Sequence, residues 1–157
     1  MSTGAEKAIS FPSAHPSTAG AGARAAEASG DRTVVRIFTL LRITYGLVPI
    51  VAGLDKFTNL LTNWEGYLNP RVLAILPLSG HAFVSMVGVV EMVAGVLVLL
   101  RPRQGAFVVT AWLVAIALSL ITSGRYLDVA VRDLVMAIGA FTLGSLAPLA
   151  TAHLSHT

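Results

Sequence analysis

Four apolar segments, each long enough to cross a lipid bilayer, constrain the fold of this chain more than any other feature. They cover residues 34–54, 82–100, 106–121 and 129–150. A helix needs about 20 predominantly apolar residues to cross the hydrocarbon core, and tilt accommodates segments of slightly different length. The pattern therefore predicts an all-α fold, in which four transmembrane helices form one integral membrane bundle.

The composition supports a membrane protein and argues against a nucleic-acid-binding one. Hydrophobic residues make up 55% of the chain and charged residues only 12%, whereas soluble domains contain about 25% charged residues. In a chain of 157 residues, four membrane helices leave no room for a second, soluble domain. The net charge of +3 does not indicate nucleic-acid binding, because the 11 Lys and Arg residues are spread along the chain. The expected partner is the lipid bilayer.

The chain contains no cysteine, and it therefore has no disulfide, thiolate metal site or dithiol couple of its own. Electron transfer would depend on a partner or on a cofactor that is not covalently bound. No metal site is predicted. A haem inside the bundle would need two histidines that face each other, but all four histidines lie in the tails or at a membrane boundary: His15, His81, His153 and His156. The GxSxG, HExxH and P-loop motifs are also missing from the sequence, as is a GxGxxG in its strand and helix context.

Three parts are predicted along the chain. Residues 1–33 are rich in Ala, Gly, Ser and Pro without apolar periodicity, so we expect a flexible N-terminal tail. The pattern of this segment does not indicate a cleavable signal peptide, because no short apolar core lies close to the N-terminus. Residues 34–150 form the transmembrane domain, and residues 151–157 form a C-terminal tail.

The distribution of basic residues predicts the orientation. One side of the membrane would carry Lys7, Arg24, Arg32, Arg36, Arg101 and Arg103, and the other side Lys56, Arg71, Arg125 and Arg132. Cytoplasmic loops carry an excess of Lys and Arg. Both termini are therefore predicted to be cytoplasmic, in a plasma or inner membrane.

The long connection between the first two predicted helices would then lie outside. Its residues Leu60, Leu61, Trp64 and Leu68 recur at helical spacing, which predicts one short helix lying on the bilayer surface. Trp64 and Tyr67 are expected to act as interfacial anchors, because Trp and Tyr are enriched at the headgroup level.

Small and charged residues share one face on three of the predicted helices. Spacings of three and four residues align Arg42, Gly46, Pro49, Gly53 and Lys56 on the first helix, Gly88, Glu91 and Gly95 on the second, and Asp133, Ala137, Ala140, Gly144 and Ala147 on the fourth. Small residues at this spacing allow membrane helices to approach closely. We therefore expect helix packing at Gly46, Gly53, Gly88, Gly95, Ala140 and Gly144.

The charged residues on these faces predict a polar network inside the membrane. Counting residues from the helix ends places Arg42 near Glu91 in an inner layer and Lys56 near Asp133 in an outer layer, which Arg125, Asp128 and Arg132 would join. The helical angle places Asp55 away from this seam. An unpaired charge in hydrocarbon costs at least about 2.5 kcal/mol, so such residues either pair or carry a function. Pairing alone and a role for Glu91 or Asp133 in moving a proton or holding a substrate both remain open.

Several of these segments resemble the DoxX-like family of small four-helix membrane proteins. The resemblance covers residues 36–149 and rests on "RITYGLVPIVAGLDKF", "NWEGYL", "VGVVEMVAGVLVLLRPRQGA" and "YLDVAVRDLVMAIGAFTLGSLA". Its most specific positions are Gly53, Lys56, Phe57, Glu91, Gly95, Arg132 and Asp133.

The resemblance implies a membrane subunit or partner of a quinone-linked oxidoreductase complex more than an independent enzyme. A groove between the helices would accept the isoprenoid tail of a quinone, and the partner would be a redox protein or a second copy of the chain. Two other functions stay open, a structural or assembly factor and a small transporter or proton-conducting bundle. The lack of an evident inverted repeat disfavours transport.

Overall fold

The computed structural model describes residues 18–75 and 78–154. Its long helices are α1 (Thr18–Thr58), α3 (Gly80–Leu100), α4 (Pro102–Ser123) and α5 (Leu127–Leu154), and the short elements η1 (Trp64–Tyr67) and α2 (Pro70–Ile75) connect α1 to α3. Within these ranges no residue forms a β-strand. All four long helices are long and apolar enough to cross a membrane. The predicted all-α, four-helix membrane bundle is confirmed.

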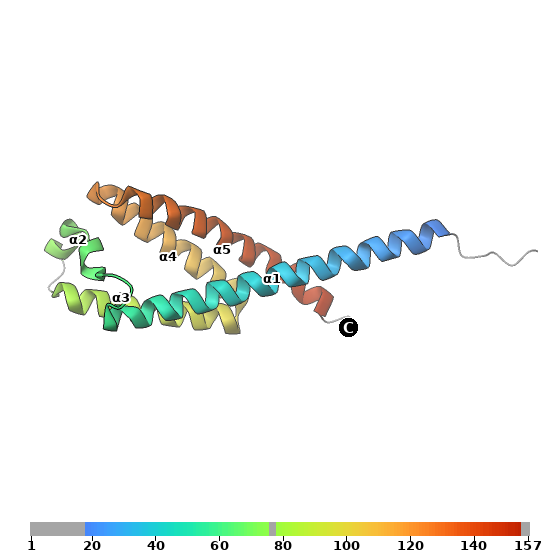
Figure 1. The fold of residues 1–157 in the computed structure, drawn as a ribbon, viewed down its shortest axis with the longest axis horizontal. Coiled ribbons are helices and arrows are strands. Elements are labelled where there is room, and N and C mark those ends of the chain that lie inside the picture. The colour runs from blue at the N-terminus through green and yellow to red at the C-terminus, as the bar shows by residue number, and fades with distance from the viewer. Residues whose placement is uncertain (1–17, 76–77, 155–157) are drawn as a thin grey trace, which may run out of the picture.

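The bundle consists of two closely packed helix pairs. α1 packs along α3, and α4 packs along α5, while contacts of α3 with α4 and of α1 with α5 join the pairs. In Figure 1 the two pairs approach each other toward the end where α5 terminates and separate toward the end that carries η1 and α2. The open end of the bundle is therefore the end at which the α1–α3 connection lies.

A buried cluster holds the two pairs together at the closed end. Its members come from all four long helices: Phe38, Ala94, Val98, Ala106, Val109, Ala140, Leu143, Ala147 and Ala150. Small side chains dominate this cluster, because membrane helices associate by close van der Waals packing and not by escape from water.

Glycines allow the backbones of α1 and α3 to lie in direct contact where the two helices cross. A Cβ atom added to Gly53 would lie 2.5 Å from the carbonyl oxygen of Gly88, and one added to Gly95 would lie 2.5 Å from that of Gly46. The small-residue faces expected on these two helices thus lie against each other. On α5, Gly144 lies against the ring of Phe107, and Ala140 is fully buried.

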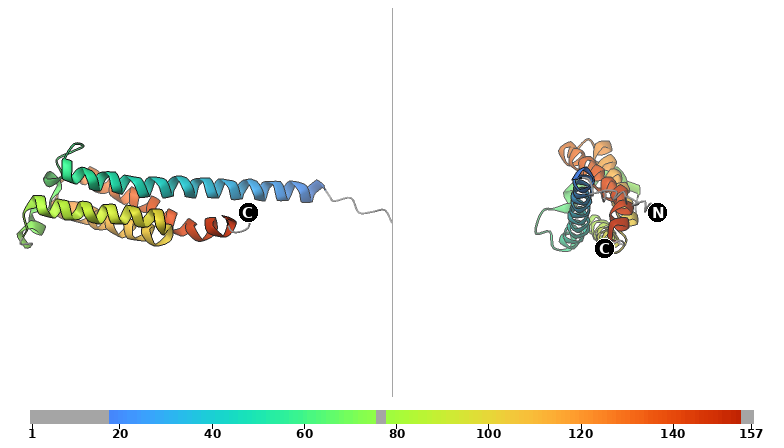
Figure 2. Two further views of the ribbon diagram at one scale, coloured as in Figure 1. Left: turned by 90° about the horizontal axis from the view of Figure 1, so that it is seen from below. Right: turned by 90° about the vertical axis from the view of Figure 1, so that its right-hand side faces the viewer.

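Helical structure extends beyond the predicted membrane segments at both ends. α1 begins at Thr18, so the predicted flexible tail is helical from this residue, and residues 1–17 lie outside the described ranges. Ala has the highest helix propensity, and extending a formed helix avoids the cost of nucleation. At about 1.5 Å per residue, the 41 residues of α1 span roughly twice the hydrocarbon thickness. Its N-terminal part projects beyond the bundle (Figure 2).

The predicted tails differ from the structure in a second place as well. α5 continues to Leu154, so residues 151–154 are helical, and the remainder of the expected C-terminal tail lies outside the described residues.

The α1–α3 connection contains two short elements instead of the single predicted helix. Pro70 separates them, since proline disfavours helical backbone in the residue before it but fits the first position of a helix.

Candidate functional site

A cavity of about 790 Å³ occupies the open end of the bundle, between the two helix pairs. All four long helices and the α1–α3 connection line it, and most of its wall is apolar, with residues such as Val87, Leu113, Ile116 and Met136. Four charged side chains interrupt this wall, those of Lys56, Glu91, Arg132 and Asp133, together with polar ones such as that of Asn69. Four of the five residues predicted for the intramembrane network therefore line one chamber.

A buried ion pair joins α1 to α3 at the cavity wall. Lys56 Nζ donates to Glu91 Oε2 at 2.6 Å, and the exposed fractions of the two residues are only 5% and 9%. The glycine contacts bring the two backbones together on the same α3 face that carries Glu91. Glu91 therefore faces the interior of the bundle, as predicted, but its partner is not the expected one.

Arg42 does not reach Glu91, which corrects the predicted inner layer. Its guanidinium Nε donates to the carbonyl oxygen of Leu99 at 3.1 Å, and Nη2 donates to the same oxygen. The last carbonyl groups of a helix lack partners within the helix, and a cation at this end also interacts favourably with the helix dipole. The antiparallel register that sets Gly46 beside Gly95 sets Arg42 beside Leu99.

The predicted outer layer is not formed as expected. Lys56 bonds Glu91, whereas Asp133 has its ion pair with Arg132, whose Nε lies 3.6 Å from Asp133 Oδ1. Arg125 lies over the ring of Tyr126 at 5.5 Å and Asp128 is exposed, so these two residues do not connect the charges. Asp133 itself is 6% exposed.

Asp55 organises the connection above the cavity, a role that the sequence pattern does not predict. It is 6% exposed, and its carboxylate accepts hydrogen bonds from the backbone amides of Leu60 and Leu61 at 2.9 and 3.1 Å. The indole nitrogen of Trp64 donates to the same carboxylate at 2.7 Å. The angular position of Asp55 on its helix does not predict these hydrogen bonds, because the partners come from the connection and not from another helix. An Asp near the end of a helix and followed by a loop is the sequence feature that could have indicated them.

Trp64 covers the charged side of the cavity. Its ring lies over the Lys56 ammonium, 3.6 Å from nitrogen to ring centroid. The ring of Tyr67 makes tilted contacts with the rings of Trp64 and Tyr126, with centroids 6.2 and 4.5 Å away. The two residues predicted as interfacial anchors therefore also line the cavity, and the cation–π contact adds to the stabilisation of the Lys56 charge.

We expect Asp55→Ala to release this cover. Three hydrogen bonds that hold the connection would be lost, so limited proteolysis of detergent-solubilised protein should cleave residues 59–69 several times faster. Asp128→Ala is the matched control, because Asp128 is exposed. Equal cleavage rates in both variants would contradict the role of Asp55.

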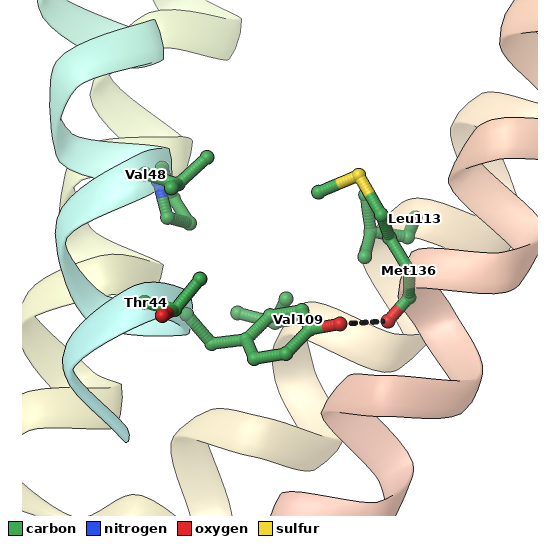
Figure 3. Close-up of a pocket in the computed structure, with 7 residues that line it drawn as sticks. Thr44, Val48, Val109, Leu113 and Met136 are labelled. Carbon is green, nitrogen blue, oxygen red and sulfur yellow. Dashed lines mark hydrogen bonds between the residues drawn. The ribbon is translucent and has the colours of Figure 1, made fainter. Parts of the chain in front are cut away.

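A smaller cavity of about 160 Å³, whose lining residues are drawn in Figure 3, shares part of its wall with the large one. Val48, Pro49, Val109, Leu113 and Met136 line both spaces. The hydroxyl of Tyr45 donates to the carbonyl oxygen of Met136 at 2.8 Å and ties α1 to α5 at this level. Since Thr44 and Val48 are exposed, the smaller cavity lies at the outer seam between α1 and α5, where the protein would meet lipid.

The chemistry of the site suits an amphipathic ligand. Among the described residues, no group of three or more His, Cys, Asp or Glu side chains is arranged to hold a metal ion. The cavity instead combines a long apolar wall with charged groups at one end, so that it can take up an apolar body and bind a polar head. Comparison with protein-family models, with curated proteins and with solved structures finds no match to this chain.

Proposed function

We propose that this protein is a DoxX-like membrane subunit or partner of a quinone-linked oxidoreductase, and that its cavity binds the quinone. The cavity of about 790 Å³ is the observation that carries this proposal. Its size falls within the range of about 300–1,000 Å³ typical of small-molecule sites. Its apolar wall and charged end match the two parts of a quinone, an isoprenoid tail and a polar ring.

The polar ring would lie beside Lys56 and Glu91. An ammonium group has three donors, and Lys56 uses one of them on Glu91, so another can serve a quinone oxygen. The tail would extend past Val48 and Met136 through the smaller cavity, toward the seam between α1 and α5. This path would give the ligand access from the bilayer.

A subunit is favoured over an independent enzyme, because the chain offers no redox chemistry of its own through cysteine. Electrons would pass between the quinone and a cofactor of a partner protein. The basic residues support an orientation with both termini on the cytoplasmic side of a plasma or inner membrane.

Quinone content of the purified protein tests the proposal. The protein is extracted in mild detergent, and its bound lipids are analysed by mass spectrometry. We expect about one quinone per protein, less in the double variant Lys56→Met with Glu91→Leu, and an unchanged amount in Asp128→Asn. A quinone level no higher than that of an unrelated four-helix membrane protein would contradict the proposal. Co-purification of a dehydrogenase-type protein would support the role as a subunit.

A further inference from the structure

Asp133 is a carboxylate in the cavity wall that is held only by a long ion pair with Arg132 among the described residues. It lines the cavity and is 6% exposed, yet among the residues that the structure describes none donates to it within hydrogen-bond distance. Its ion-pair partner Arg132 lies 3.6 Å away, with a side chain that is 65% exposed. A separation of 3.6 Å is too long for a hydrogen bond. The Asp133 oxygens are not among the enclosed side-chain atoms that lack a partner in the described part of the chain, so a ligand in the cavity can reach them and donate to them.

One carboxylate oxygen of Glu91, in the same cavity, also accepts no hydrogen bond from the described residues. Glu91 uses Oε2 to accept from Lys56, and Oε1 has no hydrogen bond from the described part of the chain. The charged end of the cavity thus presents carboxylate oxygens that accept no hydrogen bond from the protein, beside an ammonium group, that of Lys56, which has donors to spare. A ligand that fits this end should bring hydrogen-bond donors of its own.

A hydroxyl group suits a chamber that holds both free carboxylate oxygens and spare Lys56 donors. It can donate to a carboxylate and accept from the ammonium group, because a hydroxyl donates one hydrogen bond and accepts others. The carbonyl oxygens of a quinone ring can only accept.

We propose that the cavity selects the reduced form of its ligand, a hydroquinone, and that one ring hydroxyl donates to Asp133. This inference rests on the proposed function and adds the redox state to it. Lys56, Glu91, Arg132 and Asp133 are the charged groups that line the cavity, and none of the four has to change its partner for the hydroxyl to bind. A hydrogen bond to a charged acceptor corresponds to roughly ten- to hundredfold in affinity.

Equilibrium dialysis decides between the two redox forms. The purified full chain in nanodiscs is incubated without oxygen with a decyl-tailed benzoquinone, either oxidised or chemically reduced, and empty nanodiscs correct for partition into lipid. We expect the wild type to bind the reduced form at least about tenfold more tightly. Equal affinities, or tighter binding of the oxidised form, would overturn the inference and leave the proposed function standing. Binding of neither form above empty nanodiscs would remove both.

Variants then assign the preference to one residue. Asp133→Asn should bring the two affinities together, whereas Asp128→Asn, a change of the same chemistry on the same helix, should retain the preference. If Asp133→Asn does not fold, Asp133→Ser serves in its place. A preference that survives the loss of the Asp133 carboxylate would show that Asp133 does not hold the ligand.

Discussion

Glu91→Leu should lower the free energy of unfolding by about 3–5 kcal/mol, because it leaves the Lys56 ammonium charged and buried without its partner. The two groups are 2.6 Å apart, and their side chains are 6% and 11% exposed. Lys56→Leu should cost a similar amount for the same reason. The double variant should recover most of the loss, since an apolar pair of similar volume often replaces a buried ion pair without a net cost. Reversible unfolding in detergent, followed by circular dichroism, measures all three variants.

Two further variants make this cycle specific. Glu65→Leu removes a carboxylate whose side chain is 47% exposed, so it should change stability much less. Arg42→Leu combined with Glu91→Leu should give additive losses, because Arg42 bonds Leu99 and shares no partner with Glu91. Recovery in that second pair, and not in the pair with Lys56, would contradict the observed pairing.

Gly53→Ala and Gly88→Ala should each destabilise the bundle by about 1–3 kcal/mol, the usual cost of overpacking. The added methyl groups would lie 2.5 and 2.6 Å from backbone carbonyl oxygens of the facing helix. Backbone atoms cannot rotate away as a flexible side chain does, so α1 and α3 would have to separate. Folded yield and the midpoint of thermal unfolding in detergent report the effect.

Gly30 provides the matched control on α1. A Cβ atom at this position meets nothing within 4 Å, so Gly30→Ala should be neutral or stabilise the helix by up to about 1 kcal/mol. If Gly53→Ala behaved like Gly30→Ala, the close crossing of α1 and α3 would not exist.

Features that depend on local periodicity could be predicted from the sequence. The spacing of Gly46 and Gly53, and that of Gly88 and Gly95, places each pair on one helical face regardless of tertiary structure. The four apolar segments likewise specify membrane helices by length alone. The structure brings these glycines together, because close backbone approach is the main source of attraction between membrane helices.

The pairing of charges could not be predicted, because it depends on the register between helices. An estimate of depth from helix ends placed Arg42 beside Glu91, but α1 begins earlier than the apolar pattern indicates, and the glycine crossing sets the true register. Lys56 reaches Glu91 with a long side chain, which a comparison of backbone levels overlooks. The hydrogen bond of Tyr45 to Met136 joins residues 91 positions apart in the chain, and no local pattern indicates it.

The uneven packing of the bundle makes it sensitive to its surroundings. The cluster around Phe38 and Leu143 fixes the two helix pairs at one end, while the cavity keeps them apart near Lys56 and Asp133. Rotation of one pair about the fixed end changes their separation in proportion to the distance from that pivot. Bilayer thickness acts on the tilt of membrane helices, and it therefore acts on the volume of the chamber. Ligand affinity is then a property of the protein and its membrane together, and thicker or thinner bilayers should tune it without any change in sequence.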